Sequence, residues 1–91
     1  MIYVIVYDIS RDEARRKIAR YLMNKGQRVQ ESAFECKLDE KGRQAVEKAL
    51  QHLVDPEGNV RMYPLCAECY AKRIGIGQIR EPRGQKGYAI F

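Results

Sequence analysis

The sequence predicts a single α+β domain, and three observations lead to that fold class. The chain has 91 residues, too few for two domains that each bury a core. Hydrophobic residues make up 45% of it and charged residues 32%, a balance that excludes wholesale disorder. Short apolar runs typical of strands alternate with two segments of helical periodicity. We therefore expect residues 1–91 to fold as one domain.

The first nine residues predict a buried strand. Met1–Ile9 is rich in Val, Ile and Tyr, and this continuous apolar run suits a central strand that is covered on both faces. The run lacks a basic segment and a cleavage site, and Asp8 cuts it short, so it predicts neither a signal peptide nor a membrane span. Asp8 is expected where the strand ends.

A basic helix is predicted over residues 11–25. Ser10 and Glu13 match a capping box, in which each side chain bonds the backbone amide of the other residue. Gly26 offers left-handed backbone at the other end of the helix. The segment carries six basic and two acidic residues, a net charge of +4. Its apolar face consists of Ala14, Ile18, Tyr21 and Leu22.

The remaining segments predict further strands and one more long helix. Asp39 is expected to cap a helix that ends at the turn cluster of residues 55–59. A short turn or helix is expected at Ala67–Tyr70, and a basic loop before the end of the chain. The expected strands are Val29–Leu38, Val60–Cys66 with its pairing loosened by Pro64, Ile74–Gly77, and Gly87–Phe91.

These elements predict a ferredoxin-like βαββαβ sandwich. We expect the strand at 29–38 to pair beside the first strand, and the strands at 60–66 and 74–77 and the tail to complete the sheet. Helices then cover one face, and the other face stays available to a partner. A core this small gains from closing that face against a second copy, so a homodimer is expected, with residues 78–91 as a C-terminal loop and strand.

The charge of the chain predicts a polyanionic partner. Lys and Arg number 17 against 12 Asp and Glu, a net charge of +5, which favours nucleic acid or an anionic membrane surface. Residues 72–87 carry five basic residues and one acidic residue, whereas residues 26–71 carry a net charge of −2. This segregation favours a phosphate-binding surface whose affinity falls as salt rises.

The three cysteines, Cys36, Cys66 and Cys69, form no regular disulfide framework, which favours a reducing compartment such as the cytoplasm. Cys66 and Cys69 have metal-ligand spacing, but a structural zinc site needs four ligands, and beyond these two the chain offers Cys36 and His52. We expect Cys36 to be a small core residue and His52 to lie near the surface.

Asp8 is the most informative single residue. A carboxylate that closes a hydrophobic strand beside a helix N-terminus is well placed to bind a ligand. From its position alone, the same carboxylate fits a helix cap equally well. Its neighbours in the sequence shift the balance towards the ligand.

Four segments resemble the CRISPR-associated protein 2 family, small nuclease-like proteins that take part in the acquisition of foreign DNA spacers. The resemblance covers nearly the whole chain. In order, its segments are Tyr7-Asp8-Ile9, Lys25-Gly26 at the end of the basic helix, residues 28–36 (RVQESAFEC) and residues 60–65 (VRMYPL).

The resemblance implies a ferredoxin-like homodimer in which each C-terminal strand packs onto the partner's sheet. It also implies that the two Asp8 carboxylates, one from each subunit, hold one Mg²⁺, a cation that uses one or two carboxylates and keeps several waters. Tyr7 and Ser32 join Asp8 as expected catalytic residues. The expected nucleic-acid contacts are Arg15, Arg16, Lys17, Arg20, Arg28 and Phe34, with Lys17 standing where some relatives have an arginine.

The activity that the resemblance implies is metal-dependent hydrolysis of phosphodiester bonds in RNA or DNA. The alternative is a non-catalytic DNA-binding adaptor beneath the integrase, CRISPR-associated protein 1. The charge segregation favours this alternative, as does the lack of a histidine or second acid near Asp8 in the sequence that would act as general base. A third reading is an RNA-binding module that uses Tyr88 and Phe91 of the terminal segment Lys86–Phe91.

Overall fold

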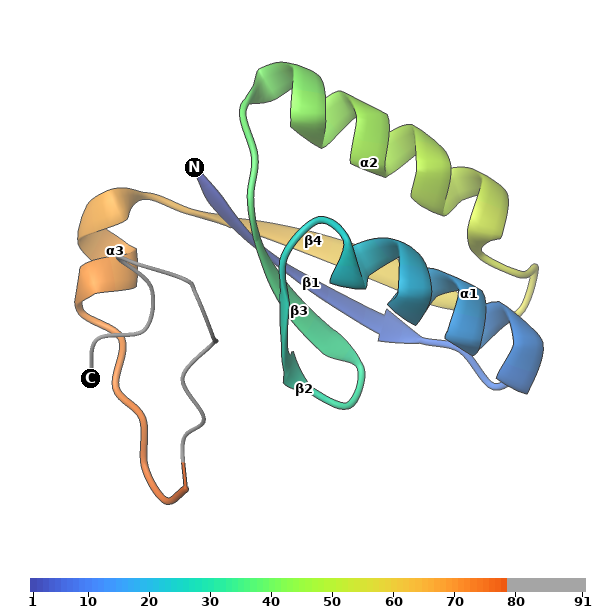
Figure 1. Ribbon diagram of the computed structural model, residues 1–91, viewed down its shortest axis with the longest axis horizontal. Helices are drawn as coiled ribbons and strands as arrows, with labels where there is room; N and C mark the ends of the chain where they lie inside the picture. The colour runs from blue at the N-terminus through green and yellow to red at the C-terminus, as the bar shows by residue number, and fades with distance from the viewer. Residues whose placement is uncertain (79–91) are drawn as a thin grey trace.

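The computed structural model describes residues 1–78 and has the predicted βαββαβ order, followed by one short helix (Figure 1). The ferredoxin-like α+β prediction is therefore confirmed. The elements are β1 (Ile2–Asp8), α1 (Asp12–Met23), β2 (Gln27–Gln30), β3 (Ala33–Lys37), α2 (Glu40–Leu53), β4 (Asn59–Leu65) and α3 (Ala67–Ala71).

The four strands form one antiparallel sheet in the order β2-β3-β1-β4. The apolar strand β1 lies inside the sheet, as predicted, but α1 and α2 cover only one of its two faces. Its Ile5 pairs with Phe34 of β3 and Met62 of β4. Pro64 is accommodated because β4 is an edge strand of the sheet that residues 1–78 form, where a missing N–H need not break a ladder.

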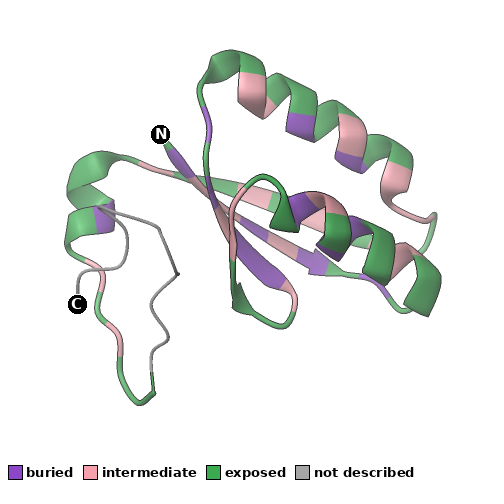
Figure 2. Cartoon of the chain, viewed as in Figure 1, coloured by how far each residue is buried: buried purple, intermediate pink, exposed green. Residues whose placement is uncertain are grey.

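The core lies between the sheet and the helices α1 and α2. Ile5 and Phe34 of the sheet are fully buried, and they pack with Ile18 and Leu22 of α1 and Val46 of α2. Figure 2 shows both helices buried along one side and exposed along the other, as expected for amphipathic helices. Because side chains alternate along a strand, the residues between these core positions lie on the opposite face of the sheet, which α1 and α2 do not cover.

The predicted strand Val29–Leu38 is in fact two strands joined by a tight turn. Residues 31 and 32 form the turn, and β3 pairs beside β1 as expected. This hairpin supplies the strand that the predicted Ile74–Gly77 was meant to supply, and residues 74–77 form no strand within residues 1–78. Ile74 and Ile76 are instead 83% and 89% exposed, because no described strand lies beside them.

The predicted capping box is wrong. Helix α1 begins at Asp12, two residues after Ser10, with Arg11 in extended conformation as its N-cap and no side chain bonding the cap. The backbone carbonyl of Arg11 accepts from the amide of Arg15 at 2.9 Å. Asp12 and Glu13 stabilise this first turn through their charge, which complements the helix dipole.

Gly26 is required for a reason other than the predicted left-handed backbone. Within residues 1–78 Gly77 is the glycine with a positive φ, so Gly26 has ordinary backbone. A Cβ at Gly26 would lie within 2.8 Å of the backbone and side chain of Cys36 and would meet the carbonyl oxygen of Glu35. The glycine therefore lets the chain after α1 approach β3 closely.

Two other predictions are confirmed. Asp39 caps α2 by accepting from the amide of Gly42 at 2.7 Å, and the short helix α3 forms where a turn or helix was expected. The expected strand Gly87–Phe91, the basic loop before it and the stacking residues Tyr88 and Phe91 lie outside the described residues. Among residues 1–78, no helix is both long and apolar enough to cross a membrane.

Candidate active site

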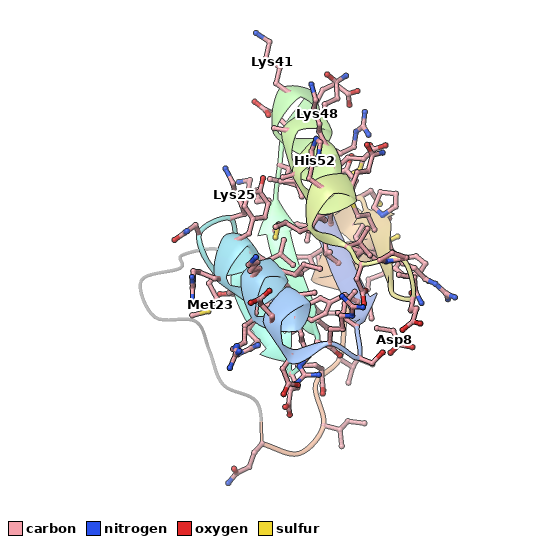
Figure 3. All side chains as sticks on the ribbon, turned by 90° about the vertical axis from the view of Figure 1, so that its right-hand side faces the viewer. Asp8, Met23, Lys25, Lys41, Lys48 and His52 are labelled. Atoms are coloured by element: carbon pink, nitrogen blue, oxygen red, sulfur yellow. The ribbon has the colours of Figure 1, made fainter. Side chains whose placement is uncertain are left out.

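Asp8 is the last residue of β1 and is exposed, beside the loop that leads into α1. It pairs with Asn59 at the start of β4, and Figure 3 shows it well away from Lys41. Strand alternation puts its side chain with Val4 and Val6 on the face away from the helices. Among residues 1–78 no side chain or amide bonds this carboxylate, so Asp8 does not cap α1 and stays open to a ligand.

Asp55 is a second acid at the same end of the sheet, brought there by the turn between α2 and β4. A point beside Gly58, where a Cβ would stand, is within 3.1 Å of both the Asp8 carbonyl oxygen and Asp55 Oδ1. The Asp55 side chain is only 6% exposed, and its oxygens accept no hydrogen bond from residues 1–78. Arg11 Nε stands 3.9 Å from Asp55 Oδ2 and balances its charge.

Nothing in the sequence predicts that Asp55 lies near Asp8. Its Asp-Pro-Glu-Gly-Asn segment was interpreted only as the turn that ends α2, which it also is, since Gly58 N donates to the Asp55 carbonyl at 3.1 Å. Asp55 therefore need not be the general base that the sequence near Asp8 lacks. Because Asp55 is nearly buried, it supports the loop through Arg11 rather than contacting a large ligand.

Arg15 fastens the start of α1 to the end of β1. Its guanidinium donates to the carbonyl oxygen of Ile9 at 3.3 Å and pairs with Asp12 one turn earlier. The bond holds the Arg15 guanidinium at Ile9, the residue that follows Asp8. Because the side chain remains 42% exposed, an anion can reach it.

Tyr7 and Phe34 lie in the core rather than at the surface. The Tyr7 ring is 2% exposed and stacks on Phe34 with ring centres 6.3 Å apart. The Tyr7 hydroxyl donates to the Glu31 carbonyl at 3.2 Å, and its backbone amide donates to the Ser32 carbonyl at 3.0 Å. These bonds hold the half-buried Ser32 beside the end of β1.

Arg28 and the basic residues of α1 are the exposed cations among the predicted contacts. The Arg28 guanidinium lies 5.4 Å from the centre of the Phe34 ring, so the buried ring orients a surface charge. Arg16, Lys17 and Arg20 are exposed on α1, with Lys17 Nζ 3.8 Å from Glu13. Arg15 and Ser32 bond the residues on either side of Asp8, through the Ile9 carbonyl and the Tyr7 amide. Arg16, Lys17 and Arg20 make no hydrogen bond to the end of β1 among residues 1–78.

A complete metal site does not exist within one copy of residues 1–78, where no three acidic, histidine or cysteine side chains converge. Cys36 is fully buried and His52 is exposed, as predicted, so neither joins Cys66 and Cys69 in a zinc site. Mg²⁺ uses one or two carboxylates and fills its remaining positions with water, so an exposed carboxylate such as that of Asp8 is chemically suited to it.

Comparison with known proteins assigns the chain to a family. Residues 1–73 match the family model described as CRISPR associated protein Cas2. The chain is 48% identical over 71 residues, 76% of each chain, to a protein of Chloroflexus aurantiacus named CRISPR-associated endoribonuclease Cas2 1. It is 35% identical over 83 residues, 90% of each chain, to a protein of Thermus thermophilus named CRISPR-associated endonuclease Cas2 2.

Solved structures share the fold of this chain. A crystal structure titled as a hypothetical protein from Thermus thermophilus matches with a TM-score of 0.74 and 34% identity, covering 88% of this chain and 96% of that one. The crystal structure of Streptococcus pyogenes Cas2 at pH 6.5 matches in fold, with a TM-score of 0.75 at 24% identity over 85% of this chain and all of that one. On the evidence of the family model and the curated relatives, the chain belongs to the Cas2 family of CRISPR-associated proteins.

Proposed function

We propose that the protein is a Mg²⁺-dependent nuclease that acts in CRISPR spacer acquisition as a homodimer. The observation that carries the proposal is the open Asp8 carboxylate at the end of β1, in a chain whose curated relatives are named endoribonucleases and endonucleases. One Asp8 from each subunit would hold the ion. The substrate is a phosphodiester of RNA or DNA.

The uncovered face of the sheet supports the proposed dimer. On that face Val4 and Val6 are half-buried and Tyr63 is 46% exposed, which leaves apolar area that a second copy would cover. Asp8 lies on the same face, at its edge. A two-fold axis that passes close to Asp8 would bring the two copies of its carboxylate together and so make a pair from one carboxylate per chain.

The residues near Asp8 each have a role in this proposal. Mg²⁺ supplies a Lewis acid that neutralises phosphate charge and makes water more acidic. Arg15, anchored on the Ile9 carbonyl, holds a cation beside the phosphate. Ser32 donates a hydrogen bond to a phosphate oxygen from the β2–β3 turn. Tyr7 is a positioning residue, because its buried hydroxyl fixes the turn that carries Ser32.

Cleavage assays with labelled RNA and DNA test this proposal. Asp8→Asn keeps the size of the side chain and removes its charge, and we expect it to lower Mg²⁺-dependent cleavage at least about a hundredfold. Glu68→Gln makes the same charge change on α3, at the other end of β4, and should cleave like the unaltered protein. Equal cleavage by the Asp8→Asn and Glu68→Gln variants would overturn the nuclease assignment.

Mixed dimers test whether the two Asp8 residues share one ion. When unaltered and Asp8→Asn subunits are mixed in equal amounts, a shared site leaves about one quarter of the activity, because only dimers with two Asp8 residues function. Independent sites would leave about one half, and that result would refute the shared ion.

A second function, a non-catalytic DNA-binding adaptor that docks the CRISPR integrase, is favoured by the basic surface of α1. Arg16, Lys17 and Arg20 are three exposed basic residues on α1. Replacing Arg16 and Arg20 by Gln should weaken duplex binding. It should also reduce the slope of log binding constant against log salt concentration by about one for each lost phosphate contact. Lys41→Gln with Lys48→Gln, on the outer side of α2 (Figure 3), is the matched control. Equal binding by the two double variants would refute this surface.

A further inference from the structure

Two exposed thiols lie together on the first turn of α3, a feature that the proposed nuclease site does not use. Cys66 is the N-cap residue of α3, and its Sγ accepts a hydrogen bond from the backbone amide of Cys69 at 3.4 Å. Both cysteines are exposed, whereas the third, Cys36, is fully buried. Figure 1 shows α3 at the end of β4 that is remote from the start of α1.

The two thiols belong to one helical turn. The Cys69 amide lies 3.4 Å from Cys66 Sγ, so the Cys66 sulfur is already directed towards residue 69. Formation of a bond between them requires rotation of side chains on one turn and no movement of β4. The Cys-x-x-Cys spacing at the beginning of a helix is also the arrangement in which thiols become reactive.

This turn makes the two thiols chemically unequal. The pKa of Cys66 is lowered, first because the Cys69 amide bonds its sulfur and then because the Cys69 thiol does so. The pKa of Cys69 is raised, because its own proton is held in the bond to Cys66. Cys66 is thus the thiol that ionises first and attacks, and Cys69 is the thiol that follows.

We propose that Cys66 and Cys69 form a redox-active dithiol that exchanges with small-molecule disulfides such as oxidised glutathione. The Cys66 thiolate attacks one sulfur of the disulfide, forms a mixed disulfide and releases one glutathione thiolate. Cys69 then loses its proton to water and attacks Cys66, which forms the Cys66–Cys69 bond and releases the second glutathione thiolate. The protein loses two electrons and two protons, and one disulfide becomes two thiols.

Oxidation leaves the surroundings of α3 in place. The turn that the new bond closes is already fixed by the Tyr70 amide, which donates to the Cys66 carbonyl at 2.9 Å. Tyr70 is 7% exposed, and its hydroxyl donates to Glu35 on β3 at 2.9 Å, which anchors the helix to the sheet. The dithiol therefore cycles on a folded protein.

Tryptic mapping after equilibration of the full chain with glutathione buffers tests the proposal. Trypsin places Cys66 and Cys69 in one peptide, residues 62–72, and Cys36 in another, residues 29–37. We expect residues 62–72 to lose two hydrogens as the buffer becomes oxidising and to regain them on reduction, while Cys36 stays reduced. Stable glutathione adducts on both thiols, or a disulfide between two copies of the chain, would overturn the proposal.

Single variants identify the attacking thiol. Cys69→Ser should accumulate a glutathione adduct on Cys66, because no second thiol resolves it. Cys66→Ser keeps an oxygen that accepts the Cys69 amide, so α3 retains its cap, and its Cys69 should form the adduct about tenfold more slowly. Equal rates in the two variants would refute the assigned order of attack.

Discussion

The two faces of the sheet come from the same strands and have different tasks. On the face beneath α1 and α2, Ile5, Phe34 and Cys36 are completely buried. On the other face Val4 and Val6 are half-buried and Tyr63 is 46% exposed. The covered face completes the core within one chain, whereas the open face, which carries Asp8, leaves apolar side chains accessible among residues 1–78.

The largest expected effect is on the covered face. Phe34→Ala removes a fully buried ring that contacts Tyr7 and supports Arg28, and we expect a loss of about 3–5 kcal/mol in unfolding free energy. Tyr63→Ala removes a similar ring from the open face. At a protein concentration low enough to keep the chain monomeric, it should cost less than about 1 kcal/mol. Urea unfolding measures both, and equal losses would erase the contrast between the faces.

The turn that carries Gly58, beside the end of β1, is expected to give the next largest loss of stability. Gly58→Ala would place a methyl group against Asp55 Oδ1 and Ile9 Cδ1. We expect a loss of about 1–3 kcal/mol, because the turn must shift to admit it. Gly77→Ala is the contrasting variant, since no atom lies within 4 Å of its new methyl group, although its positive φ adds some strain. A Gly58→Ala protein as stable as the original would show that this turn is not tightly packed.

The covered face was the part that the sequence predicted best. The apolar stripes of residues 14–22 and 45–53 and the run of β1 follow periodicities that burial imposes, so these elements lie where expected. The turn at Glu31 and Ser32 was not predicted because it contains no glycine or proline. The alternation of apolar and polar residues also continues after the turn, so residues 29–38 resemble one strand. The Ser10 cap was wrong because the loop is instead fastened by Arg15, whose bond to the Ile9 carbonyl leaves no trace in local sequence.

The candidate site was predictable only in part. Asp8 stands where its place after an apolar run indicated, and its lack of a bonding partner among residues 1–78 removes the helix-cap alternative. Asp55 was not predictable, since 47 positions separate it from Asp8 and only the pairing of β1 with β4 brings their ends together. Whether Tyr7 and Phe34 are exposed or buried also depends on which face of the sheet the helices cover.

A mutation that weakens association of two copies is expected to change the free energy by less than the core mutations do, and it tests the open face directly. Tyr63→Asp adds a charge to the surface proposed to meet a second copy, and we expect the dimer dissociation constant to rise at least about tenfold. Sedimentation velocity measures it. Met23→Asp, on an equally apolar residue that is 61% exposed on α1 (Figure 3), is the control and should leave the dimer unchanged. If Met23→Asp weakened the dimer more than Tyr63→Asp, the interface would lie on the helical side instead.

The smallest effect is a pH dependence from the covered face. Burial raises the pKa of the Cys36 thiol from 9.0 to about 11, with the neighbouring Glu35 charge adding to the rise and Lys25 opposing it. Between these values the unfolded chain releases a proton that the folded chain keeps, so the stabilising effect is complete below pH 9 and decreases as pH rises towards 11. We expect a difference on the order of 1 kcal/mol between pH 8 and pH 11.

Cys36→Ala isolates this contribution from other groups that titrate in the same range, such as Tyr21, whose pKa burial also raises. The variant is less stable at pH 8 because a cavity replaces the sulfur, but its stability should decline less steeply towards pH 11. The gap between the two proteins in urea unfolding therefore narrows as pH rises. A gap that stayed constant would mean that Cys36 titrates alike in the folded and unfolded states, which a thiol sealed beneath two helices cannot do.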